Sequence, residues 1–254
     1  ELKLRLFGVP EAIHAAVCPF ASIEGACNTA IEAIQCGLGL ARIELLDKVQ
    51  IHAVNVHSKL SLDETPTLFL EFHGSNASAR IDVESFREIA QANGALRFDW
   101  AEGSEERRRL WRARHDAFWA TRTAWPGKTV LVTDVCVPIS RLAQCVSETE
   151  ADIREFGIVA PIVGHVGDGN FHTIPVFDAA DPLQIKAIGS FLERLVARAI
   201  AMEGTCTGEH GIGQGKIDAL EKEMGTGLQV MARIKSALDP QGILNPGKII
   251  RALD

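Results

Sequence analysis

Three features are absent from this sequence, and each absence excludes a class of protein. There is no long basic run, and the formal net charge is −7, which weighs against nucleic acid as a partner because phosphate binding needs clustered Lys and Arg. The basic cluster 107–109 follows two glutamates and indicates the solvated face of a helix. No apolar run approaches the roughly 20 residues of a membrane span. From its first residues we expect no signal peptide.

The cysteines also lack a pattern, since no CxxC pair occurs among the six of them. Most stand among apolar neighbours, so we expect free buried thiols in a reducing compartment. The composition itself is that of a globular protein, with 254 residues of which 46% are hydrophobic and 23% charged. Such a chain can form one large domain or two small ones. It contains no sequence repeat, low-complexity stretch or flexible linker.

Strand-like and helix-like segments alternate in two similar runs. The pattern predicts two ferredoxin-like halves, each an antiparallel sheet with helices packed on one face, followed by C-terminal helices, in an α+β fold. The first run has predicted strands at 12–18, 41–46, 67–74 and 96–100, with helices at 23–36, through the fifties and at 81–92. The second has strands at 129–138, 159–165 and 171–177 and helices at 102–121, 140–156, 182–203, 215–224 and 227–238.

Two short stretches concentrate the residues that carry chemistry. They are 164–172 (GHVGDGNFH) and 205–213 (TCTGEHGIG), which together hold three of the eight histidines, two acids and six glycines. The Gly-Asp-Gly-Asn core of the first favours a tight turn, because Gly167 and Gly169 can adopt positive φ. If His165 ends one strand and His172 lies on the next, a hairpin brings both imidazoles to one place.

A metal site is the first hypothesis for these residues. Imidazole nitrogens from His165 and His172, with a carboxylate from Glu209, suit a divalent zinc, manganese or iron ion. Three protein ligands leave coordination positions open, so a substrate with adjacent hydroxyl and carboxylate groups could chelate there. The alternative is that both histidines are hydrogen-bonded residues at strand ends and that the turn is a plain hairpin.

Two further residues are candidates for the same site. His210 directly follows Glu209 and is a candidate base, although a cap histidine in a glycine-rich loop is the alternative. Arg114 stands on the apolar side of a predicted helix, where a buried guanidinium needs an anion. That anion is either a substrate carboxylate or an internal partner such as Asp134 or Asp116. The glycines after residue 207 do not match a dinucleotide fingerprint.

Five stretches together resemble a known family. They are GHVGDGNFH, TCTGEHGIG, LWRARHDAFWA, TDVCVPISRL and LDPQGILNPGKII. They look like the C-terminal half of the FAD-linked oxidase family, and within it they are most similar to D-lactate dehydrogenases that reduce a cytochrome or quinone. Glycolate oxidase flavin subunits and D-2-hydroxyglutarate dehydrogenases are relatives. The resemblance covers essentially the whole chain, and it implies a substrate domain lying over a flavin.

The resemblance also implies roles for individual residues. By it, the metal ligands are His165, His172 and Glu209, and the base is His210. The family's arginine that holds the substrate carboxylate corresponds to Arg114, and Asn170 belongs to the same pocket. Asn245 and Lys248 would lie near the flavin. The implied reaction is oxidation of a D-2-hydroxy acid, in which the base removes the hydroxyl proton and hydride passes to FAD.

Three positions depart from the dicarboxylate-binding branch of the family. A lysine and a threonine that bind the second carboxylate of hydroxyglutarate are replaced by Val132 and Phe118, and an asparagine is replaced by Ile174. This apolar lining favours a small monocarboxylate such as D-lactate.

The resemblance places the domain boundary near the start of the chain. Residues 1–10 look like the end of a missing FAD-binding domain, and 11–254 like the substrate and metal domain. We therefore expect FAD to be held mainly by another domain, the chain alone to be inactive, and a homodimer to be a candidate assembly. The expected location is cytoplasmic or peripheral to the inner membrane, mitochondrial in a eukaryote. The competing hypotheses are a free-standing metal-dependent hydrolase and a non-catalytic subunit.

Overall fold

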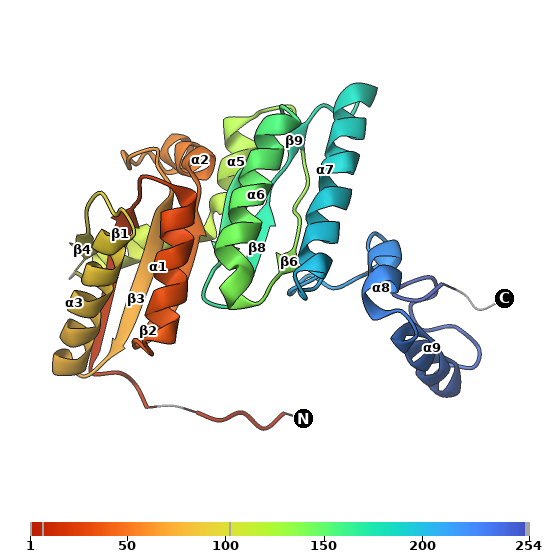
Figure 1. The fold of residues 1–254 in the computed structure, drawn as a ribbon, viewed down its shortest axis with the longest axis horizontal. Helices are drawn as coiled ribbons and strands as arrows, with labels where there is room; N and C mark the ends of the chain where they lie inside the picture. Colours follow the sequence, from red (N-terminus) through yellow and green to blue (C-terminus); the bar gives the residue numbers. More distant parts are fainter. Residues whose placement is uncertain (1, 7, 102, 252–254) are drawn as a thin grey trace.

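A single antiparallel sheet forms the centre of the computed structural model, which describes residues 2–6, 8–101 and 103–251 (Figure 1). Its seven strands lie in the order β4-β1-β3-β2-β7-β8-β6, and β5 and β9 form a separate pair. The strands are β1 (Ala12–Pro19), β2 (Leu40–Leu46), β3 (Thr67–Gly74), β4 (Asp99–Ala101), β5 (Thr129–Val130), β6 (Val135–Cys136), β7 (Ile162–His165), β8 (Asn170–Thr173) and β9 (Val176–Phe177).

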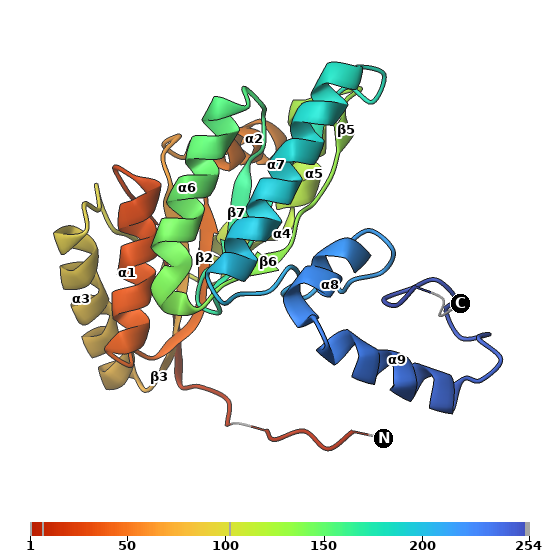
Figure 2. The ribbon, with the colours of Figure 1, turned by 45° about the vertical axis from the view of Figure 1, so that its right-hand side comes forward.

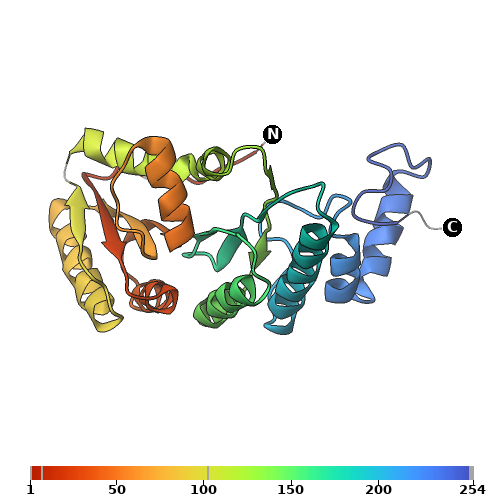
Figure 3. The ribbon, with the colours of Figure 1, turned by 90° about the horizontal axis from the view of Figure 1, so that it is seen from above.

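Helices cover both faces of this sheet (Figure 3). Four of them, α1, α3, α6 and α7, stand side by side on one face, and α2, α4 and α5 lie against the other. Beyond α7, the last two helices extend away from the sheet (Figure 2). The helices are α1 (Ile23–Gln35), α2 (Lys48–Ser58), α3 (Asn76–Ala92), α4 (Ser104–His115), α5 (Ala117–Ala124), α6 (Leu142–Glu155), α7 (Pro182–Ala201), α8 (Ile217–Met224) and α9 (Gly227–Leu238), with a 3₁₀ turn at Ile139–Arg141.

The predicted duplication is visible in the strand order. In the first half β1, β2, β3 and β4 lie in the order β4-β1-β3-β2, which is the ferredoxin-like arrangement. In the second half β7, β8 and β6 repeat it, and an isolated bridge from Cys136 to Thr205 occupies the fourth place. The halves join where β2 pairs with β7, with Leu45 opposite Gly164 and Leu46 opposite Val163. The antiparallel sheet with helices is therefore confirmed, but the expectation that helices pack on one face only was wrong, because α2, α4 and α5 cover the other face.

Some predicted boundaries were wrong. The single helix expected at 102–121 is two helices, because Asp116 departs from helical geometry, with φ −83° and ψ 7°, and α5 starts at the next residue. Residue 102 lies outside the described part. The strand expected at 129–138 is interrupted between β5 and β6. The strand expected at 171–177 is also interrupted, between β8 and β9, because Pro175 has no N–H for a continuous ladder. Residues 2–6 are exposed and form no regular element.

Two hydrophobic clusters fill the space on the two sides of the sheet. One includes Phe72 and Phe171 and packs under α1, α3, α6 and α7. The other includes Phe69 and Val163 and packs against α2, α4 and α5. Because side chains alternate along a strand, burying Phe171 in the first cluster sends its neighbours on β8 to the opposite face. All six cysteines are free, four of them buried, and no described helix is long and apolar enough to cross a bilayer.

A buried acid begins α2, immediately after the central β2 strand. The Asp47 carboxylate accepts a hydrogen bond from the Gln50 N–H at 2.7 Å, and only 4% of the residue is exposed. Burial raises the pKa of Asp47 to about 7, against the opposing effect of its backbone hydrogen bonds. The folded protein therefore retains this proton at a pH where the unfolded chain has lost it, so stability falls as the pH rises from about 4 to 7.

Asp47→Asn should remove this pH dependence, since the amide keeps a cap acceptor but does not titrate. We expect the variant to gain stability relative to the parent as the pH rises, by at least about 1 kcal/mol between pH 4.5 and 7.5. Urea unfolding at the two pH values measures this difference. Asp181→Asn, at the half-buried cap of α7, is the matched control and should show no growing gain. A flat difference for Asp47→Asn would contradict the assignment.

Candidate metal and substrate site

The β7–β8 hairpin presents both histidines of the first motif. His165 is the last residue of β7, β8 begins at Asn170, and the Asp168 N–H donates to His165 O at 2.9 Å. Gly169 has φ +76°, and a Cβ on it would stand 2.1 Å from Val137 O. The turn therefore requires glycine there for both conformation and space.

Strand register places the two rings on the same face. Val163 pairs with His172, so His165, two residues along β7, points to the same side. The ring centroids lie 5.7 Å apart. Glu209 completes the group, because its Oε1 lies 3.4 Å from His165 Nε2 and 3.1 Å from His172 Nε2. The three residues predicted as metal ligands are thus brought together, with ligand atoms within 4.8 Å of one another.

The hydrogen bonds behind the two rings favour this assignment. His172 Nδ1 lies 2.8 Å from Thr133 O, and His165 Nδ1 lies 2.8 Å from Glu44 Oε1. Because both oxygens are acceptors, we assign a proton to each Nδ1, which leaves the Nε2 lone pairs of neutral rings facing the Glu209 carboxylate. The chemistry of this donor set fits a divalent transition metal with outer-shell partners on both histidines.

The two histidines differ in electrostatic environment. The hydrogen bond to Glu44 raises the pKa of His165, against the effect of burial. Burial lowers the pKa of His172, whose side chain is only 6% exposed, and the proton on Nδ1 bonded to Thr133 partly offsets that effect. The Nε2 atoms of both rings face Glu209 Oε1. When no cation is bound, His165 is protonated more readily than His172.

A second group of possible ligands, Asp134 with His172 and His210, fits a metal less well. The fully buried Asp134 carboxylate already accepts hydrogen bonds from the Glu209 and His210 N–H groups at 3.0 and 2.9 Å and from the Thr207 hydroxyl at 2.7 Å. Burial by itself would raise the pKa of Asp134, but these hydrogen bonds hold it well below its usual range. Asp134 therefore orders the loop that carries Glu209.

Asn170 supports the loop from the strand side. Its amide donates to Asp134 Oδ1 at 2.8 Å and to Val135 O at 3.0 Å, whereas its buried Oδ1 has no partner among the described residues. Gly208 packs against it, and a Cβ on Gly208 would stand 2.0 Å from the amide nitrogen. The structure thus places Asn170 beneath the site, with one buried acceptor still open.

His210, the candidate base, lies over the ring of His172, which is one of the candidate metal ligands. The two rings stack with centroids 4.9 Å apart and planes inclined by 12°. His210 Nε2 lies 3.8 Å from Glu209 Oε1, and its side chain is 43% exposed. A ring in this position can reach a substrate held at the ligand group while remaining open to solvent.

Arg114 approaches from α4, and its internal partner is neither Asp134 nor Asp116. Its Nη2 and Nε lie 2.8 and 3.1 Å from Glu44 Oε2, and both side chains are 13% exposed. Among the described residues no other hydrogen bond of Arg114 is present. Since a guanidinium has five N–H donors, the edge formed by Nη1 and the second N–H of Nη2 is left for another anion.

A cavity of about 190 Å³ joins these groups. Its polar side is formed by Arg114, His115, His165, His172, Glu209 and His210. Its apolar side includes Phe118, Val132, Val163 and Ile174. The volume suits a small molecule with a short apolar end and an anionic end.

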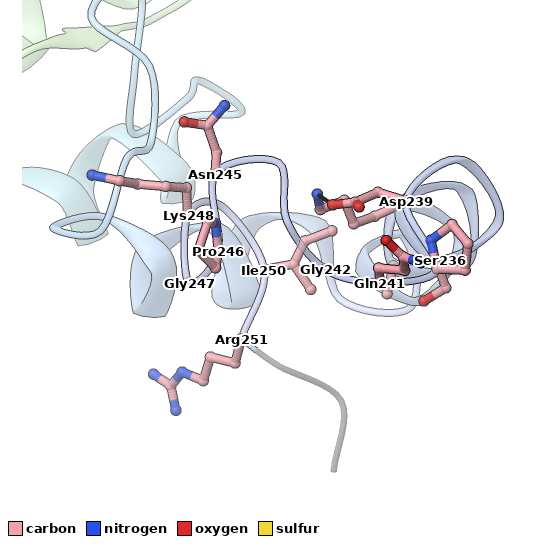
Figure 4. A pocket seen from close by; sticks show the side chains of 13 residues that line it. Ser236, Asp239, Gln241, Gly242, Asn245, Pro246, Gly247, Lys248, Ile250 and Arg251 are labelled. Carbon is pink, nitrogen blue, oxygen red and sulfur yellow. Dashed lines mark hydrogen bonds and ion pairs between the residues drawn. The ribbon is translucent and has the colours of Figure 1, made fainter.

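Asn245 and Lys248 lie elsewhere, on the C-terminal tail. They line a cavity of about 510 Å³ between α9 and the tail, to which none of the ligand group contributes. Their side chains project on the opposite side of the tail from Asp239 and Ser236 (Figure 4). The tail does contact the loop that holds His210, because the Ile249 N–H donates to Gly213 O at 2.8 Å.

Sequence reasoning missed Glu44 as part of the site. The only local signal is its position between Ile43 and Leu45, which are buried on the opposite face of β2. Asp134 gave a clearer signal as one acid in an apolar strand, but its role as acceptor for the 205–213 loop was not predicted.

Comparison with curated proteins gives matches along the whole chain. It is 50% identical over 251 residues to a Danio rerio protein named probable D-lactate dehydrogenase, mitochondrial, covering 98% of this chain and 50% of the relative. It is 41% identical to the Arabidopsis thaliana D-lactate dehydrogenase [cytochrome], mitochondrial, covering 98% and 44%. Glycolate oxidase subunit GlcD of Escherichia coli K12 is 27% identical, covering 100% and 51%. The chain thus spans about half the length of these relatives.

Solved structures share the fold at low sequence identity. The 4-ethylphenol oxidase of Gulosibacter chungangensis superposes with a TM-score of 0.71 and 18% identity, covering 97% of this chain and 55% of that one. A p-cresol methylhydroxylase gives 0.66 and 12%, covering 95% and 53%. Residues 9–249 match the family described as FAD linked oxidases, C-terminal domain, and the chain belongs to that family.

Proposed function

We propose that this chain is the substrate and metal domain of an FAD-dependent dehydrogenase that oxidises a D-2-hydroxy acid, D-lactate, to the 2-oxo acid. One observation carries the proposal: His165, His172 and Glu209 converge beside an arginine that has a free edge. The names of relatives at 50 and 41% identity support the substrate. When bound, FAD accepts a hydride, and a divalent zinc, manganese or iron ion increases the acidity of a coordinated hydroxyl.

The chain's own residues would orient the substrate and move its proton. The free edge of Arg114 is suited to bind a carboxylate with two parallel hydrogen bonds. His210 Nε2 would accept the hydroxyl proton, and Asp134 would keep that ring in place through the His210 backbone N–H. Asn170 would contribute from a neighbouring cavity, which it lines together with His165 and Glu209, and not from the one that Arg114 lines.

The flavin would be held mainly by a further domain of the protein, consistent with relatives about twice as long as this chain. We propose that residues 1–10 belong to the end of that domain and that Asn245 and Lys248 face the flavin, since the tail is tied to the His210 loop at Gly213. Electrons would pass on to a cytochrome or quinone. A mitochondrial location is proposed for a eukaryotic source, because the relatives at 50 and 41% identity are named mitochondrial.

Metal content tests the site directly. We expect about one divalent metal per chain in the purified protein and its loss in the His172→Ala, Glu209→Ala double variant, because two of three ligands are removed. Elemental analysis after dialysis measures both. Glu223→Ala, another acid near the same loop, is the control and should retain the metal. Equal metal content in the parent and the double variant would contradict the assignment.

Arg114→Lys should weaken substrate binding in the full-length holoenzyme. A lysine retains the charge but not the planar pair of N–H donors, so we expect kcat/KM for D-lactate to fall by 10- to 100-fold, about 1.4 to 2.8 kcal/mol. Steady-state kinetics with an artificial electron acceptor measures it. Arg112→Lys, exposed on the same helix, is the control. Unchanged kinetics for Arg114→Lys would remove Arg114 from the substrate pocket.

The apolar side of the cavity should determine which acid is accepted. The double variant Phe118→Thr, Val132→Lys introduces groups that can bind the second carboxylate of D-2-hydroxyglutarate. We expect the ratio of kcat/KM for D-2-hydroxyglutarate to that for D-lactate to rise at least tenfold, about 1.4 kcal/mol of discrimination. The two substrates are compared in the full-length holoenzyme. A ratio that does not change would show that selectivity arises outside this wall.

A further inference from the structure

Glu44 lies where the two halves of the sheet meet. β2 pairs with β7 through Leu45 opposite Gly164 and Leu46 opposite Val163, and the same register continued by one step puts Glu44 beside His165. Its strand neighbours Ile43 and Leu45 are buried on the other face. A carboxylate from the first half thereby reaches a metal-ligand candidate of the second half.

Each oxygen of this carboxylate has its own partner. Oε1 accepts from His165 Nδ1 at 2.8 Å, and Oε2 accepts from Arg114 Nη2 and Nε at 2.8 and 3.1 Å. The carboxylate is planar and only 13% exposed, so neither partner can turn without disturbing the other. In this way a single rigid group connects the metal-ligand group to the arginine edge.

We infer that Glu44 is a positioning residue that sets the separation between the metal site and the carboxylate-binding edge of Arg114. The inference rests on the proposed function. That function requires a specific separation between the metal site and the arginine edge, because a 2-hydroxy acid has its hydroxyl and carboxylate on adjacent carbons. Glu44 would set this separation. Glu44 orients His165 from behind, and it fixes the inner edge of Arg114 so that the outer edge faces the cavity.

A general structural ion pair is the competing explanation, and the chain offers a matched control for it. Glu71 on β3 is also a buried glutamate bonded to a histidine, with its Oε1 2.6 Å from His73 Nε2 and the residue 6% exposed. It contacts neither the ligand group nor Arg114 in the described structure. Glu71→Gln therefore removes a comparable pair on the neighbouring strand, one that bonds neither the ligand group nor Arg114.

Zinc affinity is the first measurement, made on this chain by competition with a chelator. We expect Glu44→Gln to bind Zn²⁺ roughly 10- to 100-fold more weakly than the parent, which is typical when an outer-shell partner of a ligand histidine is lost. Glu71→Gln should remain within about twofold of the parent. If Glu44→Gln does not fold, as judged by circular dichroism, the comparison is made with Glu44→Asp, which keeps the charge but is too short to reach both partners.

Substrate length is the second measurement, made on the full-length holoenzyme. D-3-Hydroxybutyrate has its hydroxyl and carboxylate one carbon further apart than D-lactate. We expect the preference for D-lactate, as a ratio of kcat/KM values, to fall at least fivefold, about 1 kcal/mol, in Glu44→Gln and to stay constant in Glu71→Gln. A purely structural role would lower both activities together and leave the ratio unchanged.

The outcomes separate this inference from the proposed function. If the parent chain binds no Zn²⁺ and the holoenzyme oxidises neither acid, the proposed function fails. If the parent binds Zn²⁺ and oxidises D-lactate but Glu44→Gln matches it in both affinity and substrate ratio, the inference is overturned and the proposed function stands.

Discussion

The hydrogen bonds to the buried Asp134 carboxylate are the interaction on which the candidate site depends. A buried charge is costly unless it is paired or hydrogen-bonded, and Asp134 satisfies this requirement with donors from the 205–213 loop and from Asn170. Those same bonds hold the backbone of Glu209 and His210 against the sheet. Two backbone bonds between Cys136 and Thr205 attach the start of the loop to the sheet, and the bonds to Asp134 extend that attachment to Glu209 and His210. The hydrogen bonds that the buried Asp134 carboxylate needs thus also determine where Glu209 and His210 lie.

The duplicated fold supplies the rest of that geometry. Alternation along β8 buries Phe171 under the four-helix layer and directs His172 to the opposite face, where α4 brings Arg114. The β2–β7 pairing adds Glu44 from the first half. Residues from segments far apart in sequence therefore meet because both halves present the same sheet face to α2, α4 and α5 (Figure 3).

The parts predicted correctly from sequence are those decided locally. The proximity of His165 and His172 could be predicted from sequence, because a glycine-containing turn and the two-residue period of a strand together determine which side of the hairpin each ring faces. The element order similarly predicted the antiparallel sheet. Glu44 could not be found in this way, because its contact with His165 spans 121 positions and depends on the register between two strands of different halves. The break at Asp116 was missed because helix-forming residues continue on both sides of it.

The network of Arg114, Glu44 and His165 is difficult to explain by stability alone. Charged groups that are 13% exposed lose much of their hydration, and the attraction between them often only balances that loss, so apolar side chains of similar size would stabilise this junction at least as well. Beside it, the second hydrophobic cluster already fills the same sheet face with residues such as Phe69 and Val163. A polar chain that leads from a metal-ligand candidate to a guanidinium with unused donors is better explained by what those donors can bind. The requirement that we propose is a fixed distance between a bound cation and the anion-binding edge of Arg114, which the shared carboxylate of Glu44 would provide with one side chain.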